Sequence, residues 1–527
     1  MQRWLVLLFV GIFCPAIHAS ALDTIGVTLL RTVTTNLNGA GVRVAQPEAV
    51  APAFEVNPAS VSVGQPAGLF TYASAAGTAN TFPNAVGSES GHADGVAANF
   101  YGLPGGVATN VLHVDNYDAD FFYNIISAAA PTNVNDPVVN QSFIFCNLDF
   151  SHLSVSREKQ INSQFDNYAT RFNTLFISGA GNGGPTNQAI IYPPASCYNG
   201  LGVAAFGGGS CIGPTLDNGR CKPDITAPAG ETSFSTPYVA GAAAILLQAG
   251  LRGDSGNDTN AAADMRSIKC LLLNGAVKPA GWTNSNSSPL DARYGAGVVN
   301  VFNSYEQLAD GKHIVNFSTN IPVNTAHPPV TIPSSINSLS GWDLETITNS
   351  STSKDAVNHY FFNVTNAANN AAFMATATIV WNRQVNQTAI NNLNLYLYNC
   401  ANSNLVACST SLVDNVEHIF VPQLPHDRYD LQILKKGGTV VTNREIYALA
   451  FEFSAPSLAI ARSGINVMIS WPIFPDNFLV ESTASLNAPA LWNTNGIPAS
   501  VVTNNQNCIW ISPSNQNQFF RLREPDF

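Results

Sequence analysis

The feature that most constrains the fold is a long apolar segment that comes after a short run of hydroxyl side chains. The run is Glu231-Thr-Ser-Phe-Ser-Thr-Pro-Tyr-Val-Ala-Gly241. Because Val239 to Leu247 holds almost no polar side chain, it predicts a helix buried on all sides. Pro237 suits the first turn of such a helix, where a missing N–H costs nothing. Ser233 would then lie at the helix N-terminus, where backbone amides stabilise developing negative charge.

Local features alone favour a structural role for Ser233, because serine is a preferred N-cap of a core helix. A catalytic role needs more, since a hydroxyl is a weak nucleophile until a base lies within hydrogen-bond reach. Three further segments offer partners for such a role. They are Gly41-Val-Arg-Val-Ala45, Ser90-Gly-His-Ala-Asp-Gly-Val-Ala-Ala98 and Leu175-Phe-Ile-Ser-Gly-Ala-Gly-Asn-Gly-Gly-Pro185.

Taken together, these segments resemble the subtilisin-like serine proteases (subtilases), and the resemblance spans residues 40–305. The run around Ser233 resembles the family's nucleophile segment, except that Glu231 stands where the family has glycine. The second segment resembles the family's His-Gly-Thr-His-Val-Ala-Gly helix start, with His92 on the first histidine. The third resembles the family's Ala-Gly-Asn-x-Gly-Pro turn, whose asparagine donates to the oxyanion. The resemblance implies Ser233 as nucleophile, His92 as general base and Asn182 as oxyanion donor.

The acidic member of the triad is less plainly marked. Gly41-Val-Arg-Val-Ala45 resembles the family's first parallel strand, Gly-Val-x-Val-Ala-Val-Ile-Asp, and its register places Glu48 on the family's aspartate. A glutamate carries the same charge on one more methylene group. Two rival carboxylates are Asp94, two residues after His92, and Asp115, at the end of an expected strand. The resemblance therefore implies Glu48 as the orienting acid, with Asp94 and Asp115 as open alternatives.

Two segments are expected to line the pocket for the substrate residue before the scissile bond. Val138-Val-Asn-Gln-Ser-Phe143 resembles the edge strand of the family's substrate cleft, and the other segment is the strand before Asn182. The expected lining residues are Ser142, Phe143, Ile144, Ser178, Gly179 and Ala180. The implied substrate is a polypeptide, hydrolysed by a monomer that needs no cofactor for its chemistry. Calcium is common in the family, but no loop shows a calcium-ligand spacing, and no Cys/His spacing predicts a metal site.

The pattern of apolar residues divides the chain into domains. Apolar strands alternate with helices up to about residue 303, which predicts an α/β fold, a parallel sheet with helices on both faces. With the resemblance, residues 22–312 are expected to be a subtilisin-like catalytic domain. Residues 313–337 are rich in Pro, Ser, Thr and Asn and predict a linker, so the catalytic domain should fold without the C-terminal residues. A period of two then predicts an antiparallel β-sandwich, resembling a jelly roll, over 338–455, and a small β module over 456–527.

The N-terminus and the cysteines predict an exported protein. Residues 1–21 combine Arg3, an apolar run too short to span a membrane, and Ala19-Ser-Ala21, which together predict a signal peptide. Export would place the chain in the periplasm, at the cell surface or outside the cell. Of the nine cysteines, Cys14 lies in this segment and eight remain. An even number in an exported chain favours disulfides, with Cys211–Cys221 and Cys400–Cys408 as candidate pairs that each close a short loop.

The charge balance excludes some partners. The net charge is −11 and only 11% of the residues are charged, which argues against nucleic acid or an anionic membrane as partner. Two functional hypotheses remain. The first is an exported serine endopeptidase. The second is a binding or adhesive protein on a catalytically decayed subtilase fold, suggested by Glu231, Glu48 and the replacement of the family's Gly, Thr and His by Ala93, Asp94 and Gly95.

Overall fold

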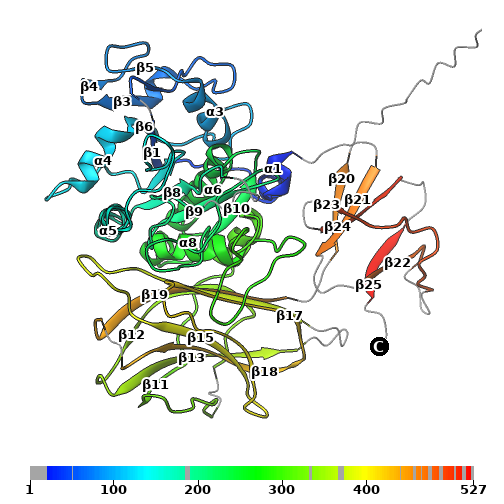
Figure 1. The fold of residues 1–527 in the computed structure, drawn as a ribbon. Helices are drawn as coiled ribbons and strands as arrows, with labels where there is room; N and C mark the ends of the chain where they lie inside the picture. Colours follow the sequence, from blue (N-terminus) through cyan, green and yellow to red (C-terminus); the bar gives the residue numbers. More distant parts are fainter. Residues whose placement is uncertain are drawn as a thin grey trace, which may run out of the picture.

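The computed structural model describes residues 20–49, 51–183, 190–331, 335–365, 373–438, 441–454, 458–463, 466–472, 478–485, 491–503, 506–512 and 518–523. These residues form a layered α/β domain, a β-sandwich packed beneath it and a small β module at one side (Figure 1). The predicted signal peptide lies outside the described residues except for Ser20 and Ala21.

The α/β domain is built on an eight-stranded sheet with the order β10-β9-β8-β7-β1-β6-β3-β4. All neighbouring strands pair in parallel except β3 and β4, which are antiparallel. The strands are β1 (Arg43–Glu48), β3 (Phe70–Ser74), β4 (Gly77–Ala79), β6 (His113–Asp118), β7 (Val138–Gln141), β8 (Leu175–Gly179), β9 (Leu201–Phe206) and β10 (Ile225–Pro228). A separate ribbon pairs β2 (Ala53–Glu55) with β5 (Ser88–Glu89). The predicted α/β fold class is confirmed.

Helices cover both faces of this sheet. Helices α4 and α5 pack together on one face, whereas α6 packs against β7, β8, β9 and β10 and also contacts α3. The helices are α1 (Ala21–Thr24), α2 (Val27–Val33), α3 (Gly91–Phe100), α4 (Ala119–Ser127), α5 (Val155–Phe172), α6 (Thr232–Arg252), α7 (Thr259–Ala262), α8 (Met265–Asn274) and α9 (Val301–Ala309), with a short 3-10 turn at Ala67–Leu69.

Helix α6 is the apolar helix predicted from the sequence. Its length and hydropathy would allow it to cross a membrane, but 83% of its most apolar window is buried within the protein. It therefore serves as the central core helix. It begins at Thr232, so Pro237 lies in its second turn and not in its first as expected.

The β-sandwich consists of two antiparallel sheets with the orders β11-β13-β18-β15-β16 and β12-β19-β14-β17. Alternate residues of the strands fill the space between the sheets, as the period of two predicts. The strands are β11 (Phe317–Pro322), β12 (Ser340–Thr348), β13 (Lys354–Val364), β14 (Phe373–Trp381), β15 (Leu393–Asn399), β16 (Leu405–Ser409), β17 (Val416–Leu424), β18 (Asp427–Lys435) and β19 (Arg444–Ser454).

The segment predicted to be a linker belongs to this sandwich. Strand β11 lies within residues 313–337 and pairs with β13 from Phe317 to Pro322. Further along, the ring of His327 packs on that of Tyr396 at a centroid distance of 4.4 Å, and its Nδ1 lies 2.7 Å from Gln432 Oε1. A sequence rich in Pro, Ser and Asn therefore forms an edge strand and a strap across the sheet.

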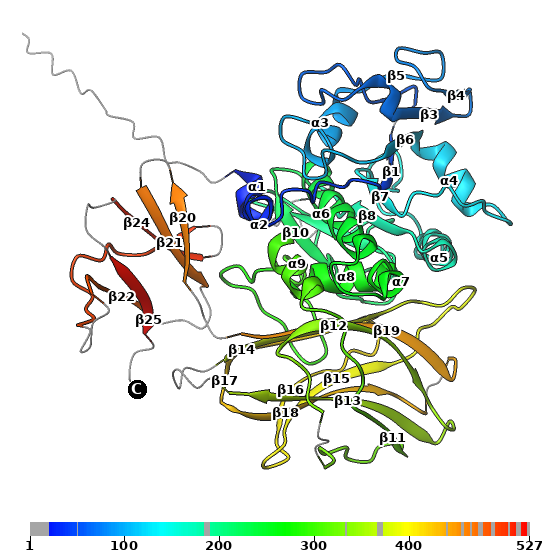
Figure 2. The ribbon, with the colours of Figure 1, turned by 180° about the vertical axis from the view of Figure 1, so that it is seen from behind.

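The α/β domain and the sandwich share one hydrophobic core. Helix α8 lies against β14 and β19, and α9 lies against β12 (Figure 2). Five sandwich side chains belong to the same buried cluster as the α/β core, namely Trp342, Val380, Val416, Ala448 and Ala450. Hydrogen bonds cross the same boundary, because Asn274 Oδ1 accepts from the hydroxyls of Thr376 at 3.1 Å and Thr378 at 2.9 Å. The sandwich therefore completes the core of the α/β domain, whereas the sequence predicted two domains joined by a linker.

The C-terminal module forms a cluster of its own. It contains β20 (Ala459–Ser463), β21 (Asn466–Pro472), β22 (Leu479–Thr483), β23 (Val501–Thr503), β24 (Gln506–Ile511) and β25 (Phe519–Arg523). Among the residues that the structure describes, its buried side chains, such as Ile469 and Ile509, form a cluster with other residues of the module. This agrees with a separate small β domain.

The predicted disulfides are not formed, and Cys211, Cys221, Cys400 and Cys408 are free thiols. Cys211 is buried beside Ala180, whereas the backbone amide of Cys221 donates to Asp414 of the sandwich at 2.7 Å. Burial raises the pKa of Cys221 and of Cys400 to about 12, and it also raises the pKa of Cys408. Cys211 and Cys221 thus occupy different surroundings, which closeness in sequence does not reveal.

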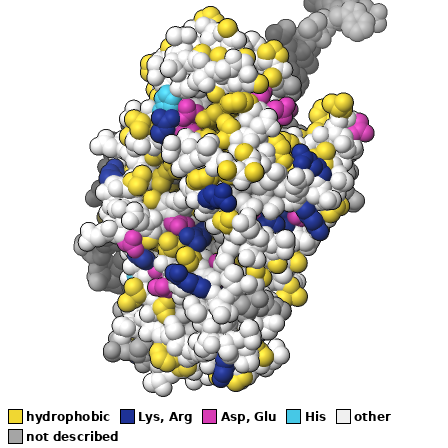
Figure 3. All heavy atoms as spheres, turned by 90° about the vertical axis from the view of Figure 1, so that its left-hand side faces the viewer, with side chains coloured by type: hydrophobic (Ala, Val, Ile, Leu, Met, Phe, Trp, Pro, Cys, Tyr) yellow, Lys and Arg dark blue, Asp and Glu magenta, His cyan; other side chains and the backbone are white. Residues whose placement is uncertain are grey.

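Charged side chains are few on the face of the molecule that Figure 3 shows. They lie scattered among hydrophobic side chains and among other side chains and backbone. This matches the low charge content of the sequence.

Candidate active site

The four residues expected to carry the chemistry stand at or near the carboxyl ends of parallel strands. Glu48 is the last residue of β1, Asn182 comes after β8, and Ser233 lies in the first turn of α6, which comes after β10. His92 is the second residue of α3, which Ser90 caps by accepting from the Ala93 amide. Ligand sites of parallel sheets form at this edge. Residues that are far apart in the sequence are thereby brought to the same edge of the sheet.

His92 and Glu48 are in direct contact. His92 Nδ1 lies 2.9 Å from Glu48 Oε2, and Glu48 is fully buried while the His92 side chain is 36% exposed. The rival carboxylates are engaged elsewhere. Asp94 accepts from the Asn57 amide at 2.7 Å, and Asp115 pairs with Arg43. Glu48 is therefore the carboxylate that the fold brings to the imidazole.

The contact shapes the ionisation of both groups. Burial raises the pKa of Glu48, and the hydrogen bond with His92 opposes that rise. The same hydrogen bond raises the pKa of His92, burial opposes it, and the charges of Glu48 and Glu231 add to the rise. A carboxylate on Nδ1 also fixes the neutral tautomer with its lone pair on Nε2. The imidazole is thus prepared to accept a proton on the side away from Glu48.

Ser233 is not the N-cap of α6, because Glu231 occupies that position. Its carbonyl would normally accept a hydrogen bond from the residue four positions on, but Pro237 has no N–H to donate. Ser142 Oγ donates to this carbonyl instead, at 2.9 Å, and Ser233 Oγ donates to the Ser142 carbonyl at 3.4 Å. Because Pro237 has no N–H, the Ser233 carbonyl can accept from Ser142. Through this hydrogen bond the residue after β7 holds the nucleophile segment.

The ring of Phe234 joins the two helices beside the site. It lies 5.7 Å from the His92 ring, centroid to centroid, and a Cβ on Gly95 would approach Phe234 Cε1 to 2.7 Å. Asn99 Nδ2 donates to the Phe234 carbonyl at 3.1 Å and so ties α3 to α6. The absence of a side chain at Gly95, a departure from the family pattern, is what makes room for Phe234.

Asn182 is exposed and held by the first residue of α6. Its Oδ1 accepts from both the amide and the hydroxyl of Thr232, each at 2.8 Å. A backbone N–H can only donate, so this contact fixes which end of the Asn182 amide is oxygen. The Nδ2 donor is then the end directed away from Thr232. An oxyanion donor needs its N–H groups directed at the substrate, and this orientation is compatible with that role.

The structure divides the expected substrate-lining residues into two groups. Phe143 and Ile144 are partly exposed, whereas Ser142 is buried against Ser233. Ser178 is buried with its hydroxyl on Gln141, and Gly179 and Ala180 are buried as well. A Cβ on Gly179 would meet the hydroxyl oxygens of Thr236 and Thr232 at 3.2 and 3.3 Å. Residues 178–180 therefore support α6, and Phe143 and Ile144 remain as candidates for substrate contact.

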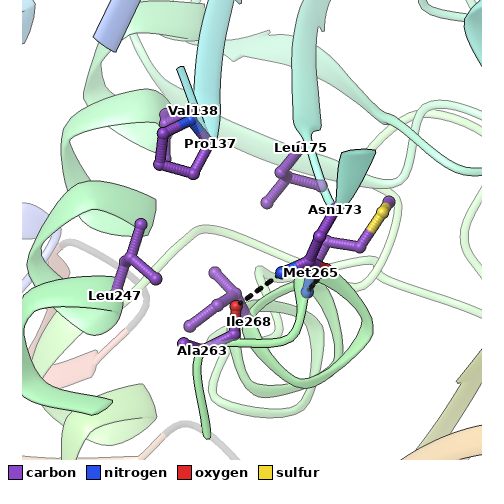
Figure 4. A pocket seen from close by; sticks show the side chains of 8 residues that line it. All are labelled: Pro137, Val138, Asn173, Leu175, Leu247, Ala263, Met265 and Ile268. Atoms are coloured by element: carbon purple, nitrogen blue, oxygen red, sulfur yellow. Dashed lines mark hydrogen bonds between the residues drawn. The ribbon is translucent and has the colours of Figure 1, made fainter. Parts of the chain in front are cut away.

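A small apolar cavity elsewhere in the domain is separate from this site (Figure 4). Its lining residues are Pro137, Val138, Asn173, Leu175, Leu247, Ala263, Met265 and Ile268. Leu247 lies fourteen residues after Ser233 in α6, which corresponds to roughly 21 Å along the helix axis. Within the described residues there is also no group of three or more His, Cys, Asp or Glu that could hold a metal ion. The cluster around Ser233 is thus the candidate active site.

Comparison with known protein families finds a match over part of the chain. Residues 76–297 match the model of the subtilase family. The segment contains His92, Asn182 and Ser233 but not Glu48. No curated protein matches the sequence.

Two solved structures are similar to part of the chain. A mutant of the protease domain of PatA has 20% identity and a TM-score of 0.36, covering 52% of this chain and 97% of that one. The prenylagaramide maturation protease PagA has 20% identity and a TM-score of 0.36, covering 54% of this chain and 99% of that one.

Proposed function

We propose that this chain, whose residues 76–297 match the subtilase family, is a serine endopeptidase that works through Ser233, His92, Glu48 and Asn182. The family match supports the broader statement that it is a serine peptidase acting on polypeptides. The observation that carries the finer proposal is the 2.9 Å contact between His92 Nδ1 and the buried Glu48 carboxylate, within a site that also holds Ser233 and Asn182.

In the proposed peptide hydrolysis each of these groups has one role. Ser233 Oγ attacks the scissile carbonyl carbon and passes its proton to His92 Nε2, while Glu48 stabilises the imidazolium that forms. The carbonyl oxygen gains charge and is stabilised by Asn182 Nδ2 and by the Ser233 amide at the N-terminus of α6. His92 then gives the proton to the leaving amine. Water then attacks the acyl-enzyme and passes its proton to His92. His92 returns a proton to Ser233 Oγ as the second product leaves.

The resting hydroxyl does not yet point at the base, since its hydrogen bond is to the Ser142 carbonyl at 3.4 Å. Such contacts commonly tighten only when substrate binds. The substrate is a polypeptide, and Phe143 and Ile144 are its candidate contacts. We also propose that the protein acts after export, on the basis of the N-terminal signal pattern, and as a monomer without a cofactor.

A fluorophosphonate probe tests this function without knowledge of the preferred peptide. Only a serine activated by a base reacts quickly with the probe. We expect a single adduct on the peptide that contains Ser233, located by mass spectrometry. A folded protein that stays unlabelled, with no hydrolysis of denatured casein, would favour a binding protein on a decayed protease fold.

The oxyanion donor gives a prediction of moderate size. Asn182→Ala is expected to lower kcat by roughly 10²–10³ with little change in KM, because the lost hydrogen bond forms fully only in the transition state. Thr232→Val keeps the backbone amide that orients Asn182 and should cost less. Steady-state kinetics on one peptide measures both variants. A change confined to KM would place Asn182 in substrate binding instead.

A larger loss of kcat is expected when the orienting acid is changed. Glu48→Gln is expected to lower kcat by roughly 10³–10⁴, because the amide removes the charge and can present the wrong hydrogen-bond partner to His92. Glu48→Asp keeps the charge and should retain much more activity. The comparison is made at one pH with matched melting temperatures. If both variants keep nearly full activity while Asp94→Asn abolishes it, the orienting acid is Asp94.

A further inference from the structure

A buried glutamine lies directly behind the His92–Glu48 pair. Gln46 is fully buried on β1, two residues before Glu48, so the two side chains share one face of the strand. Its Nε2 donates to Glu48 Oε1 at 3.0 Å and to the Ala93 carbonyl at 3.0 Å. Its Oε1 accepts from the Tyr101 hydroxyl at 2.5 Å. Every hydrogen-bonding direction of the amide nitrogen is therefore used.

The orientation of the Gln46 amide is determined by its partners. The Glu48 carboxylate and the Ala93 carbonyl can only accept, so the nitrogen must face them and the oxygen must face Tyr101. Tyr101 is the C-cap of α3, and Ala93 is the residue after His92. One side chain thus links the acid on β1 to both ends of the helix that carries the base.

This glutamine accompanies the change from aspartate to glutamate. In the strand pattern of the family, position 46 holds valine and position 48 holds aspartate. A longer acid has an additional torsion to restrict, and an apolar neighbour could not restrict it by a hydrogen bond. In this chain the two Glu48 oxygens are shared between two donors, Oε1 with Gln46 and Oε2 with His92.

We propose that Gln46 is a positioning residue for the catalytic acid, which holds the longer Glu48 side chain so that Oε2 faces His92 Nδ1. This proposal rests on the proposed function. The amide also stabilises the ionised carboxylate, since a hydrogen bond to the charged form favours that form. It thereby offsets part of the cost of burying Glu48.

The proposal predicts a shift in the pH dependence of the reaction. The active state combines an ionised Glu48 with a neutral His92. Without Gln46, the active state loses a hydrogen bond to the charged Glu48 carboxylate. The state in which the His92–Glu48 pair holds one more proton loses less stabilisation, because that proton can move onto Glu48. The acid limb of the rate profile should therefore move to higher pH. A side chain that only fills space would not move this limb.

The test compares Gln46→Met with the wild type by measuring the fluorophosphonate labelling rate as a function of pH. Methionine keeps a similar length and flexibility but has no amide to donate. We expect a roughly tenfold to hundredfold slower reaction at neutral pH, the range typical of one hydrogen bond to a charged group, and an acid limb at higher pH. Should Gln46→Met not fold, Gln46→Leu replaces it, because leucine also has no group that donates to Glu48 and should shift the limb in the same direction.

Gln65→Met is the matched control. Gln65 is also buried, and its Nε2 donates to the Tyr101 and Thr109 carbonyls at 2.6 and 3.0 Å, but it does not touch Glu48. It should lower the melting temperature without moving the acid limb. An unchanged limb in the Gln46 variant, or an equal shift in Gln65→Met, would overturn the proposal. A wild type that fails to label would instead refute the proposed function.

Discussion

Ser233→Ala is expected to lower kcat by roughly 10⁶-fold and to abolish labelling by a fluorophosphonate, because no other group can form the acyl-enzyme. The fold should be unaffected. The Ser233 hydroxyl makes one long hydrogen bond, 3.4 Å to Ser142, and it does not cap α6. A substitution of this kind changes the free energy of unfolding by about 0.5 kcal/mol or less. Peptide hydrolysis and thermal unfolding of the same preparation measure the two effects.

Ser235→Ala provides the control for this experiment. Ser235 lies two residues later in the same helix, is fully buried, and donates to the Thr232 carbonyl at 3.1 Å. Its loss should reduce stability modestly and leave hydrolysis close to that of the wild type. If Ser233→Ala retains activity near the wild type, the serine is only a structural residue of the helix start and the nucleophile lies elsewhere.

Ending the chain after residue 316 is expected to prevent the α/β domain from folding. The truncation removes Trp342, Val380, Val416, Ala448 and Ala450 from the shared core, and burial of each large apolar side chain contributes about 1.5–3 kcal/mol. A folded domain is stable by only about 5–15 kcal/mol in total. The loss from the shared core alone is therefore comparable with the whole stability.

A buried ion pair adds to this effect. Arg383 of the sandwich lies 2.6 Å from Asp166 of α5, which is fully buried, and removing one partner of such a pair costs about 3–5 kcal/mol. Asn199 and the Arg383 backbone also exchange hydrogen bonds of 2.8 and 2.9 Å. We expect the shortened protein to show no cooperative unfolding transition by circular dichroism.

A chain ending after residue 455 is the appropriate comparison. It loses only the C-terminal module, whose buried side chains pack among themselves. It should unfold cooperatively at close to the wild-type temperature and retain labelling at Ser233. A chain of 316 residues that folds and labels equally well would mean that the sandwich is dispensable, as the composition of the presumed linker had suggested.

The sequence was most informative where local pattern and chemistry coincide. The apolar run after Ser233 predicted the central helix α6, because a helix without a polar face has to be buried. The resemblance of residues 175–185 to a segment of the subtilases implied a strand ended by a turn with Asn182, and the structure has β8 directly before Asn182. Pro237 led to a wrong placement of the helix start. A proline is equally compatible with the second turn of a helix when a side chain donates to the carbonyl that the proline leaves without an N–H partner.

By itself, the sequence determined the α/β class and the sandwich, because periodicity is a local property. Its resemblance to the subtilases implied which groups gather around Ser233. Only the tertiary structure decided which carboxylate faces His92, that Gln46 lies behind it and that Gly95 admits the Phe234 ring. It decided that the cysteines of the two predicted disulfides remain unpaired. It also decided that the sandwich completes the core of the α/β domain. Each of these depends on atoms brought together from distant parts of the chain, and their distances are set by packing rather than by sequence separation.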